Sequence, residues 1–167
     1  MSAPAVDPDR HGPPARDDED PHAHDLCDPS ASGRPPPLEG IYETVLYGPD
    51  LGALAHFYID LLGLRQIEGG PADLLVACRL PDGGVLLLFD PAAAGATGRE
   101  VPAHGSTGPS HVAFRVAPEE LMAWQAWLEL RGVEIEREVH WSDGLRSIYM
   151  RDPAGNSVEL AGGELWD

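Results

Sequence analysis

Two short segments of the sequence each place one side chain that can bind a metal ion among small or polar neighbours. In residues 110–116, His111 alternates with valines and a phenylalanine, and in residues 157–161, Glu159 is flanked by a valine and a leucine. Because successive side chains of a strand point to opposite faces, each pattern predicts a strand that anchors one face and presents its imidazole or carboxylate on the other. Both groups are common ligands of divalent ions. An ordinary solvated strand face has the same pattern, so these two segments alone leave both interpretations open.

Charge and composition narrow the classes of partner and chemistry. The 167 residues carry a formal net charge of −17, with 28 acidic residues against 11 basic ones, and every basic residue is arginine. Such a charge repels nucleic acid and anionic membranes, and the absence of lysine excludes a lysine Schiff base. The two cysteines, Cys27 and Cys78, form no disulfide framework. With no membrane-length apolar run and no signal-peptide pattern, we expect a soluble cytoplasmic protein.

The first part of the chain differs in composition from the rest. Residues 1–38 are rich in proline and acidic residues and hold few apolar ones, which predicts a disordered tail. Residues 39–167 have the size of an ordinary single domain. Within it we expect a first module at 39–90, a linker loop at 91–109 that is mobile, and a second module at 110–163.

The two modules repeat one order of elements. Turn residues, helical spacing of apolar residues and alternating strand patterns predict strand, helix and three further strands in each module. The sequence therefore indicates an α+β fold built from two βαβββ modules. The expected strands are 41–47, 64–68, 73–80, 85–89, 111–116, 133–140, 146–150 and 157–161, and the expected helices are 51–62 and 118–131.

Comparing the modules adds a third candidate ligand. Glu43 lies in the first strand of the first module, as His111 does in the second. The last strand of the first module offers only leucines around Leu87 where the second module has Glu159. The repeat therefore predicts four inward positions, three of which carry possible metal ligands.

Three stretches resemble the vicinal oxygen chelate superfamily, which includes glyoxalases, bleomycin resistance proteins and extradiol dioxygenases. They are residues 57–64 (FYIDLLGL), 111–114 (HVAF) and 149–160 (YMRDPAGNSVEL). The resemblance covers residues 40 to about 163. It implies a glyoxalase-like fold in which two βαβββ modules form a curled mixed sheet around a metal-binding cleft.

The resemblance also implies a ligand set. It assigns metal binding to Glu43, His111 and Glu159, and a catalytic role to the two glutamates. The fourth-strand glutamate of glyoxalase I falls near Leu87, which argues against lactoylglutathione lyase activity, and Glu43 replaces a histidine of the usual dioxygenase set. Two carboxylates and one imidazole suit one divalent ion such as Mn²⁺, Fe²⁺, Ni²⁺ or Zn²⁺. Open positions on that ion leave room for two adjacent substrate oxygens and for Lewis-acid catalysis.

Four further residues are candidates for contact with substrate. Arg115 shares a face with His111 and suits an anion, although a pair with a carboxylate is equally open. Ser147 and Tyr149 share a face of the expected strand 146–150 and offer hydroxyl groups. His140 precedes a turn and fits the mouth of the cleft, while surface or structural roles are more common for such a histidine.

Two functions from different classes follow. The first is a divalent-metal-dependent enzyme, with lyase, isomerase or dioxygenase chemistry, that acts on a small vicinally oxygenated substrate. The second is a metal-free protein of the bleomycin resistance type that sequesters a small molecule. Two carboxylates converging in a cleft without a cation would be costly, which favours the enzyme. By analogy within the superfamily, a homodimer is also expected.

Overall fold

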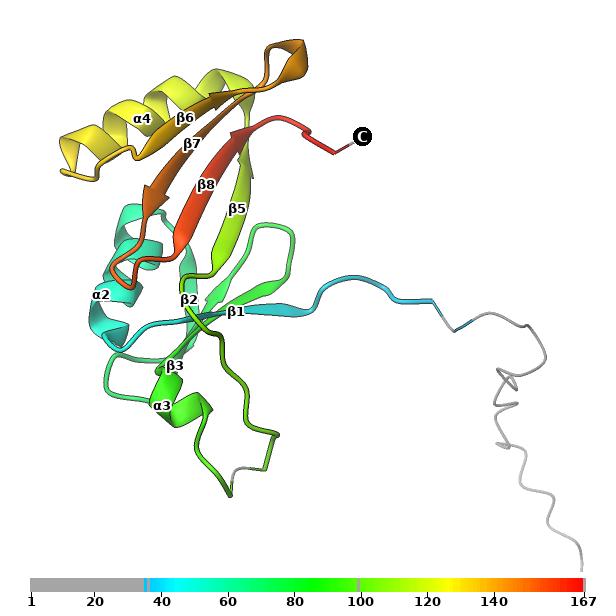
Figure 1. The fold of residues 1–167 in the computed structure, drawn as a ribbon, viewed down its shortest axis with the longest axis vertical. Coiled ribbons are helices and arrows are strands. Elements are labelled where there is room, and N and C mark those ends of the chain that lie inside the picture. The colour runs from blue at the N-terminus through cyan, green and yellow to red at the C-terminus, as the bar shows by residue number, and fades with distance from the viewer. Residues whose placement is uncertain (1–34, 36, 99, 167) are drawn as a thin grey trace, which may run out of the picture. The chain divides into compact units, whose positions relative to one another are not determined.

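Eight strands form two separate four-stranded sheets with the same order, β1-β4-β3-β2 and β5-β8-β7-β6 (Figure 1). In each sheet the first strand runs parallel to the last, and the other neighbours are antiparallel. This confirms the α+β fold of two βαβββ modules. The strands are β1 Glu43–Tyr47, β2 Arg65–Gly69, β3 Leu75–Arg79, β4 Val85–Phe89, β5 His111–Val116, β6 Arg137–His140, β7 Arg146–Arg151 and β8 Ser157–Gly162.

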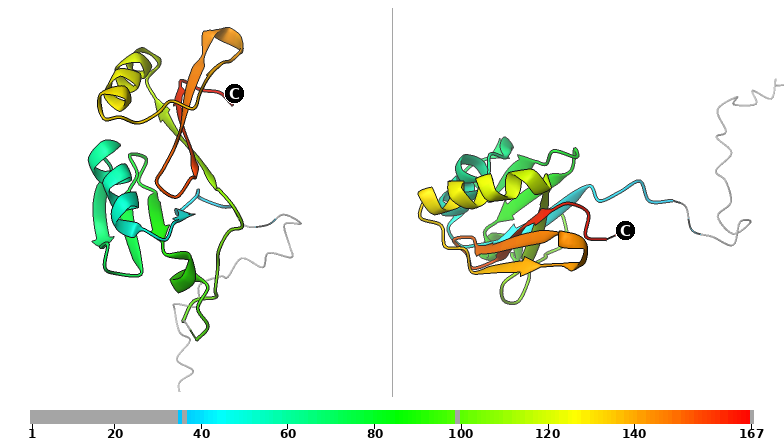
Figure 2. Two further views of the ribbon diagram at one scale, coloured as in Figure 1. Left: turned by 60° about the vertical axis from the view of Figure 1, so that its left-hand side comes forward. Right: turned by 90° about the horizontal axis from the view of Figure 1, so that it is seen from above.

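The two sheets do not close into one curled sheet within the chain, as two further views also show (Figure 2). This computed structural model describes residues 35, 37–98 and 100–166, of which those from Gly40 onward belong to one compact unit. Of the predicted tail, the structure describes only residues 35, 37 and 38. The rest of the tail, with Cys27, lies outside the described residues. Cys78 is a buried free thiol, and burial raises its pKa to about 11.

Seven of the eight strands agree with the expected ranges to within two residues at each end, and β6 is the exception. It begins at Arg137 rather than Val133. The backbone N–H of Val133 is already used, because it donates to the carbonyl of Leu128 and closes the end of the preceding helix. A residue engaged in a helix cap does not also pair in the sheet.

The helices are more divided than the apolar spacing predicted. The expected helix 51–62 is an α-helix, α2 Leu51–Ala55, that continues as the π-helical segment η1 His56–Leu61. The expected helix 118–131 begins as a 3-10 turn, η2 Pro118–Glu120, before α4 Leu121–Leu130. A further 3-10 turn, η3 Ser142–Gly144, precedes β7. In the described part of the chain, no helix has both the length and the apolar character needed to cross a membrane.

The linker between the modules, for which a mobile loop stays our prediction, contacts the rest of the domain at several points. It begins with a short helix, α3 Pro91–Ala94, capped by the Asp90 carboxylate. Further along, the backbone N–H of His104 donates to the carbonyl of Ala94, and Nδ1 of His104 lies 2.7 Å from the Tyr47 hydroxyl. The sequence shows no periodicity here because these attachments are individual contacts rather than a repeating element.

Both modules contribute to one hydrophobic core, which lies on the helix-facing sides of the sheets. Polar contacts also join the modules: the buried Tyr58 hydroxyl donates to Asp152 Oδ2 at 2.9 Å, and Trp127 Nε1 donates to the Leu61 carbonyl at 2.9 Å. The opposite sheet faces are left for the functional side chains. The largest fully buried core side chains include Tyr58, Leu46, Leu54, Leu86, Leu88, Leu128, Ile148 and Met150.

Candidate functional site

The register of the second sheet places His111 and Glu159 on the same face. Glu159 on β8 lies opposite Ala113 on β5, two residues from His111. Directly opposed residues share a face, so the imidazole and the carboxylate are diagonal neighbours. His111 Nε2 lies 3.4 Å from Glu159 Oε2. The structure therefore brings together the two residues that the strand patterns singled out.

Glu159 is a buried carboxylate with an uncompensated oxygen. The residue is 5% exposed, and its Oε1 has no hydrogen-bond partner among the residues that the structure describes. The His111 side chain is 51% exposed, so one side of the pair is accessible. Burying a carboxylate oxygen without a donor or a cation costs free energy. This donor set, an accessible imidazole beside a partly unsatisfied carboxylate, fits a divalent cation.

Tyr149 lies beside both His111 and Glu159. It lies directly opposite Glu159 across β7 and β8, and its ring is nearly parallel to that of His111, with 6.3 Å between the ring centroids. The pKa of Tyr149 is raised to about 12, mainly by burial and to a smaller extent by interaction with the Glu159 carboxylate. The hydroxyl therefore keeps its proton at neutral pH, and this proton is shared with the Glu159 carboxylate.

Ser147 lies below this surface rather than on it. Its residue is fully buried, and Trp141 Nε1 donates to its hydroxyl oxygen at 2.9 Å. The indole of Trp141, which precedes β7 in the chain, therefore occupies the Ser147 hydroxyl. A buried and bonded hydroxyl of this kind has a structural role, and direct contact of Ser147 with substrate stays a prediction.

Arg115 and His140 have different surroundings. Arg115 is on the face that carries His111, and its guanidinium forms an ion pair with Glu164, beyond the end of β8. His140 pairs across the sheet with Arg146, on the face opposite to that of Ser147, and its Nε2 lies 2.9 Å from a Glu138 carboxylate oxygen. The structure thus keeps Arg115 near the candidate site and places His140 on the other side of the sheet.

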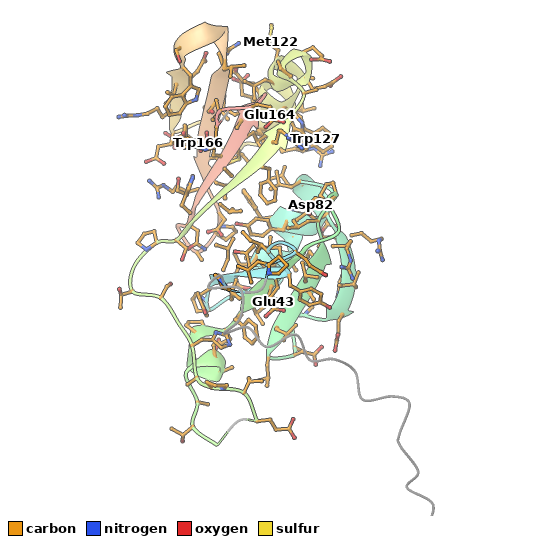
Figure 3. The ribbon with its side chains drawn as sticks, turned by 90° about the vertical axis from the view of Figure 1, so that its right-hand side faces the viewer. Glu43, Asp82, Met122, Trp127, Glu164 and Trp166 are labelled. Carbon is orange, nitrogen blue, oxygen red and sulfur yellow. The ribbon has the colours of Figure 1, made fainter. Side chains whose placement is uncertain are left out.

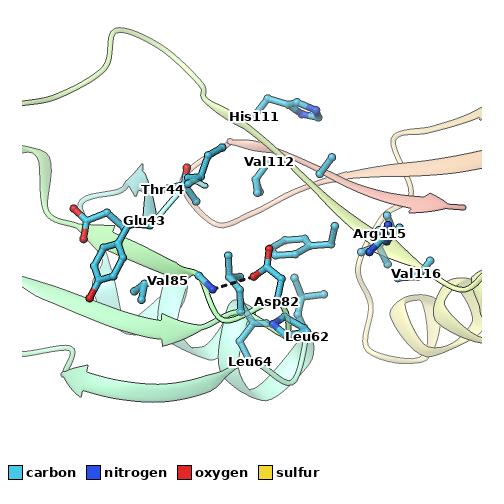
Figure 4. A pocket seen from close by; sticks show the side chains of 18 of the residues that line it. Glu43, Thr44, Leu62, Leu64, Asp82, Val85, His111, Val112, Arg115 and Val116 are labelled. Carbon is cyan, nitrogen blue, oxygen red and sulfur yellow. Dashed lines mark hydrogen bonds between the residues drawn. The ribbon is translucent and has the colours of Figure 1, made fainter. Parts of the chain in front are cut away.

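Glu43 is not brought to the other two predicted ligands within one chain. It lies on β1, whereas His111 and Glu159 lie on the second sheet, and the described residues hold no cluster of three or more His, Cys, Asp or Glu side chains suited to a metal ion. Glu43 and His111 do line a common cavity of about 660 Å³. Their side chains point away from each other there (Figure 4).

Leu87, the position of the missing fourth ligand, is part of an apolar surface. It pairs with Val45 on β1. Neither side chain of this pair can bind a metal ion or carry a proton. On the first sheet, Glu43 is therefore the residue that the repeat pattern indicates as a metal ligand. Its role as a ligand stays a prediction.

Glu164 is a residue of this region that the sequence patterns did not indicate. It follows Gly163, whose φ of +106° is a conformation that favours glycine, and the turn brings the carboxylate back to Arg115. Figure 3 shows Glu164 near the end of β8, far from Glu43 on the first sheet. The glycine pair 162–163 at the end of the last strand was the signal for a turn, but the pairing of Glu164 with Arg115 could not be inferred from it.

Comparison with known proteins agrees with this architecture. The family model of the Glyoxalase/Bleomycin resistance protein/Dioxygenase superfamily matches residues 40–160. Among curated proteins none matches the chain. The solved structure of a lactoylglutathione lyase from Agrobacterium tumefaciens is 36% identical, with a TM-score of 0.72, covering 78% of this chain and 98% of that one.

Two further solved structures are more distant. A glyoxalase/bleomycin resistance protein/dioxygenase from Nocardioides is 25% identical, with a TM-score of 0.63 and coverage of 83% of this chain and 95% of that one. The fosfomycin resistance protein FosX from Listeria monocytogenes, in complex with Mn(II), is 20% identical, with a TM-score of 0.58 and coverage of 77% and 93%, and shows likeness of fold alone. From the family match and the shared fold, this chain belongs to the Glyoxalase/Bleomycin resistance protein/Dioxygenase superfamily.

Proposed function

We propose that the protein is a divalent-metal-dependent enzyme that acts on a small substrate with two adjacent oxygens. The observation that carries this proposal is the buried Glu159 Oε1, which has no hydrogen-bond partner in the described residues and lies in a carboxylate beside the accessible His111. A cation would compensate this oxygen. The ion would supply Lewis-acid activation of the two substrate oxygens, with His111 and Glu159 as its ligands.

A second copy of the chain supplies Glu43 in this proposal. β1 and β5 are edge strands, so each has one unpaired backbone edge. A two-fold arrangement that sets β1 of one copy beside β5 of the other would bring Glu43 toward His111 and Glu159 twice. Ile41 and Tyr42, next to Glu43, are 84% and 82% exposed, as expected for apolar residues that a partner covers.

The remaining side chains would position the substrate and move protons. Tyr149 keeps its hydroxyl proton at neutral pH, and once a cation holds Glu159 this hydroxyl would donate its hydrogen bond to a substrate oxygen. Glu43 would also accept a substrate proton, which is the catalytic role that the resemblance to the superfamily implies. The choice between lyase, isomerase and dioxygenase chemistry depends on the substrate, and the apolar Leu87 still argues against the lactoylglutathione lyase reaction for which the 36% identical relative is named.

A metal-free sequestering function is the alternative. The cavity of about 660 Å³ with largely apolar walls is of a size that holds a small molecule. Such a protein would bind its ligand equally well after chelation of metals. The enzyme is favoured because an apolar sequestering cleft gives no reason to bury the Glu159 carboxylate.

Metal binding tests the proposal directly. We expect EDTA-treated, dialysed protein to bind Mn²⁺ in isothermal titration calorimetry, and His111→Ala to lose at least about tenfold in affinity. His140→Ala is the matched control, because His140 is an exposed histidine on the opposite face of the same sheet. Equal affinities for wild type and His111→Ala, or no Mn²⁺ binding by wild type, would contradict the proposal.

Mixing two variants that each lack one proposed metal ligand tests whether a second copy of the chain supplies Glu43. Glu43→Gln and Glu159→Gln each remove one ligand from every site. If a site takes Glu43 from one copy and Glu159 from the other, refolding an equal mixture restores one intact site in each mixed dimer, about a quarter of the wild-type sites. A mixture that binds no more Mn²⁺ than the separate variants would show that all ligands come from one chain.

A further inference from the structure

Arg115 lies at a fixed distance from the candidate metal ligands. It is four residues beyond His111 on β5 and therefore on the same face. At the rise of a strand, the two Cα atoms are about 13 Å apart. Both residues line the same cavity (Figure 4). A molecule that extends along β5 from the imidazole would thus reach the guanidinium.

The surface between these residues is made of small side chains. Ala113 lies between them on β5 and faces Glu159, and Ala161 on β8 faces Arg115. Ala113 is exposed and lines the cavity, so its methyl group leaves space above β5, whereas Ala161 is buried and only provides a small, apolar neighbour. This strip is therefore suited to an aliphatic or otherwise unbranched part of a ligand.

Glu164, which forms an ion pair with Arg115, is easily displaced by another anionic group. The side chains of Arg115 and Glu164 are 67% and 63% exposed, and ion pairs this accessible to water are weak. Glu164 is carried by the segment after β8, beyond the turn at Gly163. An anionic group on a ligand could take the place of its carboxylate without opening the sheet.

Two other arginines of this sheet form ion pairs that are less exposed to water. Arg146 is bonded to Glu138, and Arg151 makes two hydrogen bonds to Glu136. The chain as a whole carries a net charge of −17, which disfavours anions in solution near its surface. Binding an anionic substrate therefore requires a local cation, and Arg115 is a cation that lines the cavity with His111.

We propose that Arg115 is a specificity-determining residue, which binds an anionic oxygen group on the far end of the substrate, and that Glu164 occupies its guanidinium until that group displaces it. The substrate is then a molecule with two adjacent metal-binding oxygens at one end and a carboxylate or a phosphate-like group at the other, separated by an unbranched spacer. This inference rests on the proposed function, because His111 and Glu159 must hold the metal-binding end.

Two hydroxamic acids form a matched pair of probes. Octanohydroxamic acid and suberic acid monohydroxamate have the same chain length and the same chelating group with two adjacent oxygens, but only the second ends in a carboxylate. Each is titrated into the Mn²⁺-loaded full chain as wild type, Arg115→Gln and Glu164→Gln. The control variant is Arg65→Gln, an exposed arginine on the first sheet.

We expect wild type to bind the suberic probe about fivefold more tightly than the octanoic one. Arg115→Gln should bind both probes equally, with unchanged affinity for the octanoic one, since the chelating contacts are intact. Glu164→Gln should increase the preference for the suberic probe, and Arg65→Gln should leave it unchanged.

The failures of the two proposals are distinguishable. If the octanoic probe binds but the terminal carboxylate adds nothing in wild type, or if Arg115→Gln keeps the preference, the inference about Arg115 is wrong while the proposed function stands. If neither probe binds the Mn²⁺-loaded wild type, the metal site itself is contradicted, and the role of Arg115 falls with it. An unaltered preference in Glu164→Gln would remove Glu164 from the proposal.

Discussion

Single polar side chains in buried positions provide most of the evidence for function. Glu159 was visible in the sequence as a polar residue in an apolar strand, but the pattern could not show whether its carboxylate would be solvated, paired or left unsatisfied. The structure shows an oxygen without a hydrogen-bond partner in the described residues. An uncompensated buried oxygen costs stability, so removing its charge should help the apoprotein and harm metal binding.

The variant Glu159→Gln should therefore change two measurements in opposite directions. We expect the thermal unfolding midpoint of the EDTA-treated protein to rise by a few degrees, because a buried negative charge is removed. We expect Mn²⁺ affinity to fall at least about tenfold, because a ligand is lost. A variant that is less stable in EDTA would show that the carboxylate is compensated by groups in the chain, and would weaken the case for a cation.

The hydroxyl of Tyr58 is a buried group with a structural role. It donates to Asp152 across the two modules. Tyr58→Phe removes this bond to a charged acceptor and should lower the free energy of unfolding by about 1.5–3 kcal/mol, measured by urea denaturation. Glu134→Gln, at an exposed position without an assigned role, should have no measurable effect. Equal stabilities of the two variants would contradict this role.

The same tyrosine gives a dependence on pH. Burial and the neighbouring Asp152 raise the pKa of Tyr58 well above its ordinary value of 10. Above pH 10 the unfolded chain loses this proton while the folded chain keeps it, so the stabilisation is complete below pH 10 and decreases as pH rises. The difference in unfolding free energy between wild type and Tyr58→Phe should shrink by about 1.4 kcal/mol from pH 9 to pH 11. A constant difference would show that the proton is not retained.

At the scale of single strands and turns, particular glycines set the geometry of the first sheet. The β2–β3 pair contains a register shift between Gln66 and Glu68, and β2 ends at Gly69, which has a φ of +69°. A Cβ atom there would overlap the carbonyl oxygen of Leu75. Gly83, in the turn between β3 and β4, also has a positive φ, of +95°, but open space around it.

These two glycines form a matched pair for mutation. Gly83→Ala should cost about 1–2 kcal/mol, since only the left-handed backbone conformation is penalised. Gly69→Ala carries the same penalty plus a steric clash, and should cost about 1–3 kcal/mol more. Urea denaturation of both variants measures the difference, and equal losses would show that β2 shifts readily and that the close approach to Leu75 is not required.

At the scale of the whole molecule, Asn156 joins the two modules. Its Oδ1 accepts from the Ser110 N–H at 2.9 Å, and its Nδ2 donates to the Tyr47 carbonyl at 3.2 Å. Ser110 opens the second module and Tyr47 ends β1 of the first. One buried side chain therefore satisfies backbone groups of both modules, which favours their unfolding together.

Loss of this side chain should uncouple the modules. Asn156→Ala leaves backbone polar groups unsatisfied and should cost about 1–3 kcal/mol. All four tryptophans lie between Trp124 and Trp166, so fluorescence reports the second half of the chain, whereas far-ultraviolet circular dichroism reports both modules. In urea the two signals should coincide for wild type and for the exposed control Glu134→Ala, and separate for Asn156→Ala. Coincident transitions in that variant would show that other contacts maintain the coupling.

The sequence by itself determined the repeated βαβββ order, most strand bounds and the face on which His111 and Glu159 lie. These features depend on neighbouring residues, through the two-residue period of strands and through turn chemistry. The leucines around Leu87 likewise established that one ligand position of the glyoxalase pattern is apolar.

Only the tertiary structure decided which of these side chains meet. It brought His111 and Glu159 within 3.4 Å, placed His140 on the opposite face, paired Arg115 with Glu164 and left Glu43 on the other sheet. Such contacts join residues far apart in the chain, and they depend on the register between strands and on how two modules pack. No local pattern encodes that register, because the free energy that selects it comes from the burial of both modules in one core.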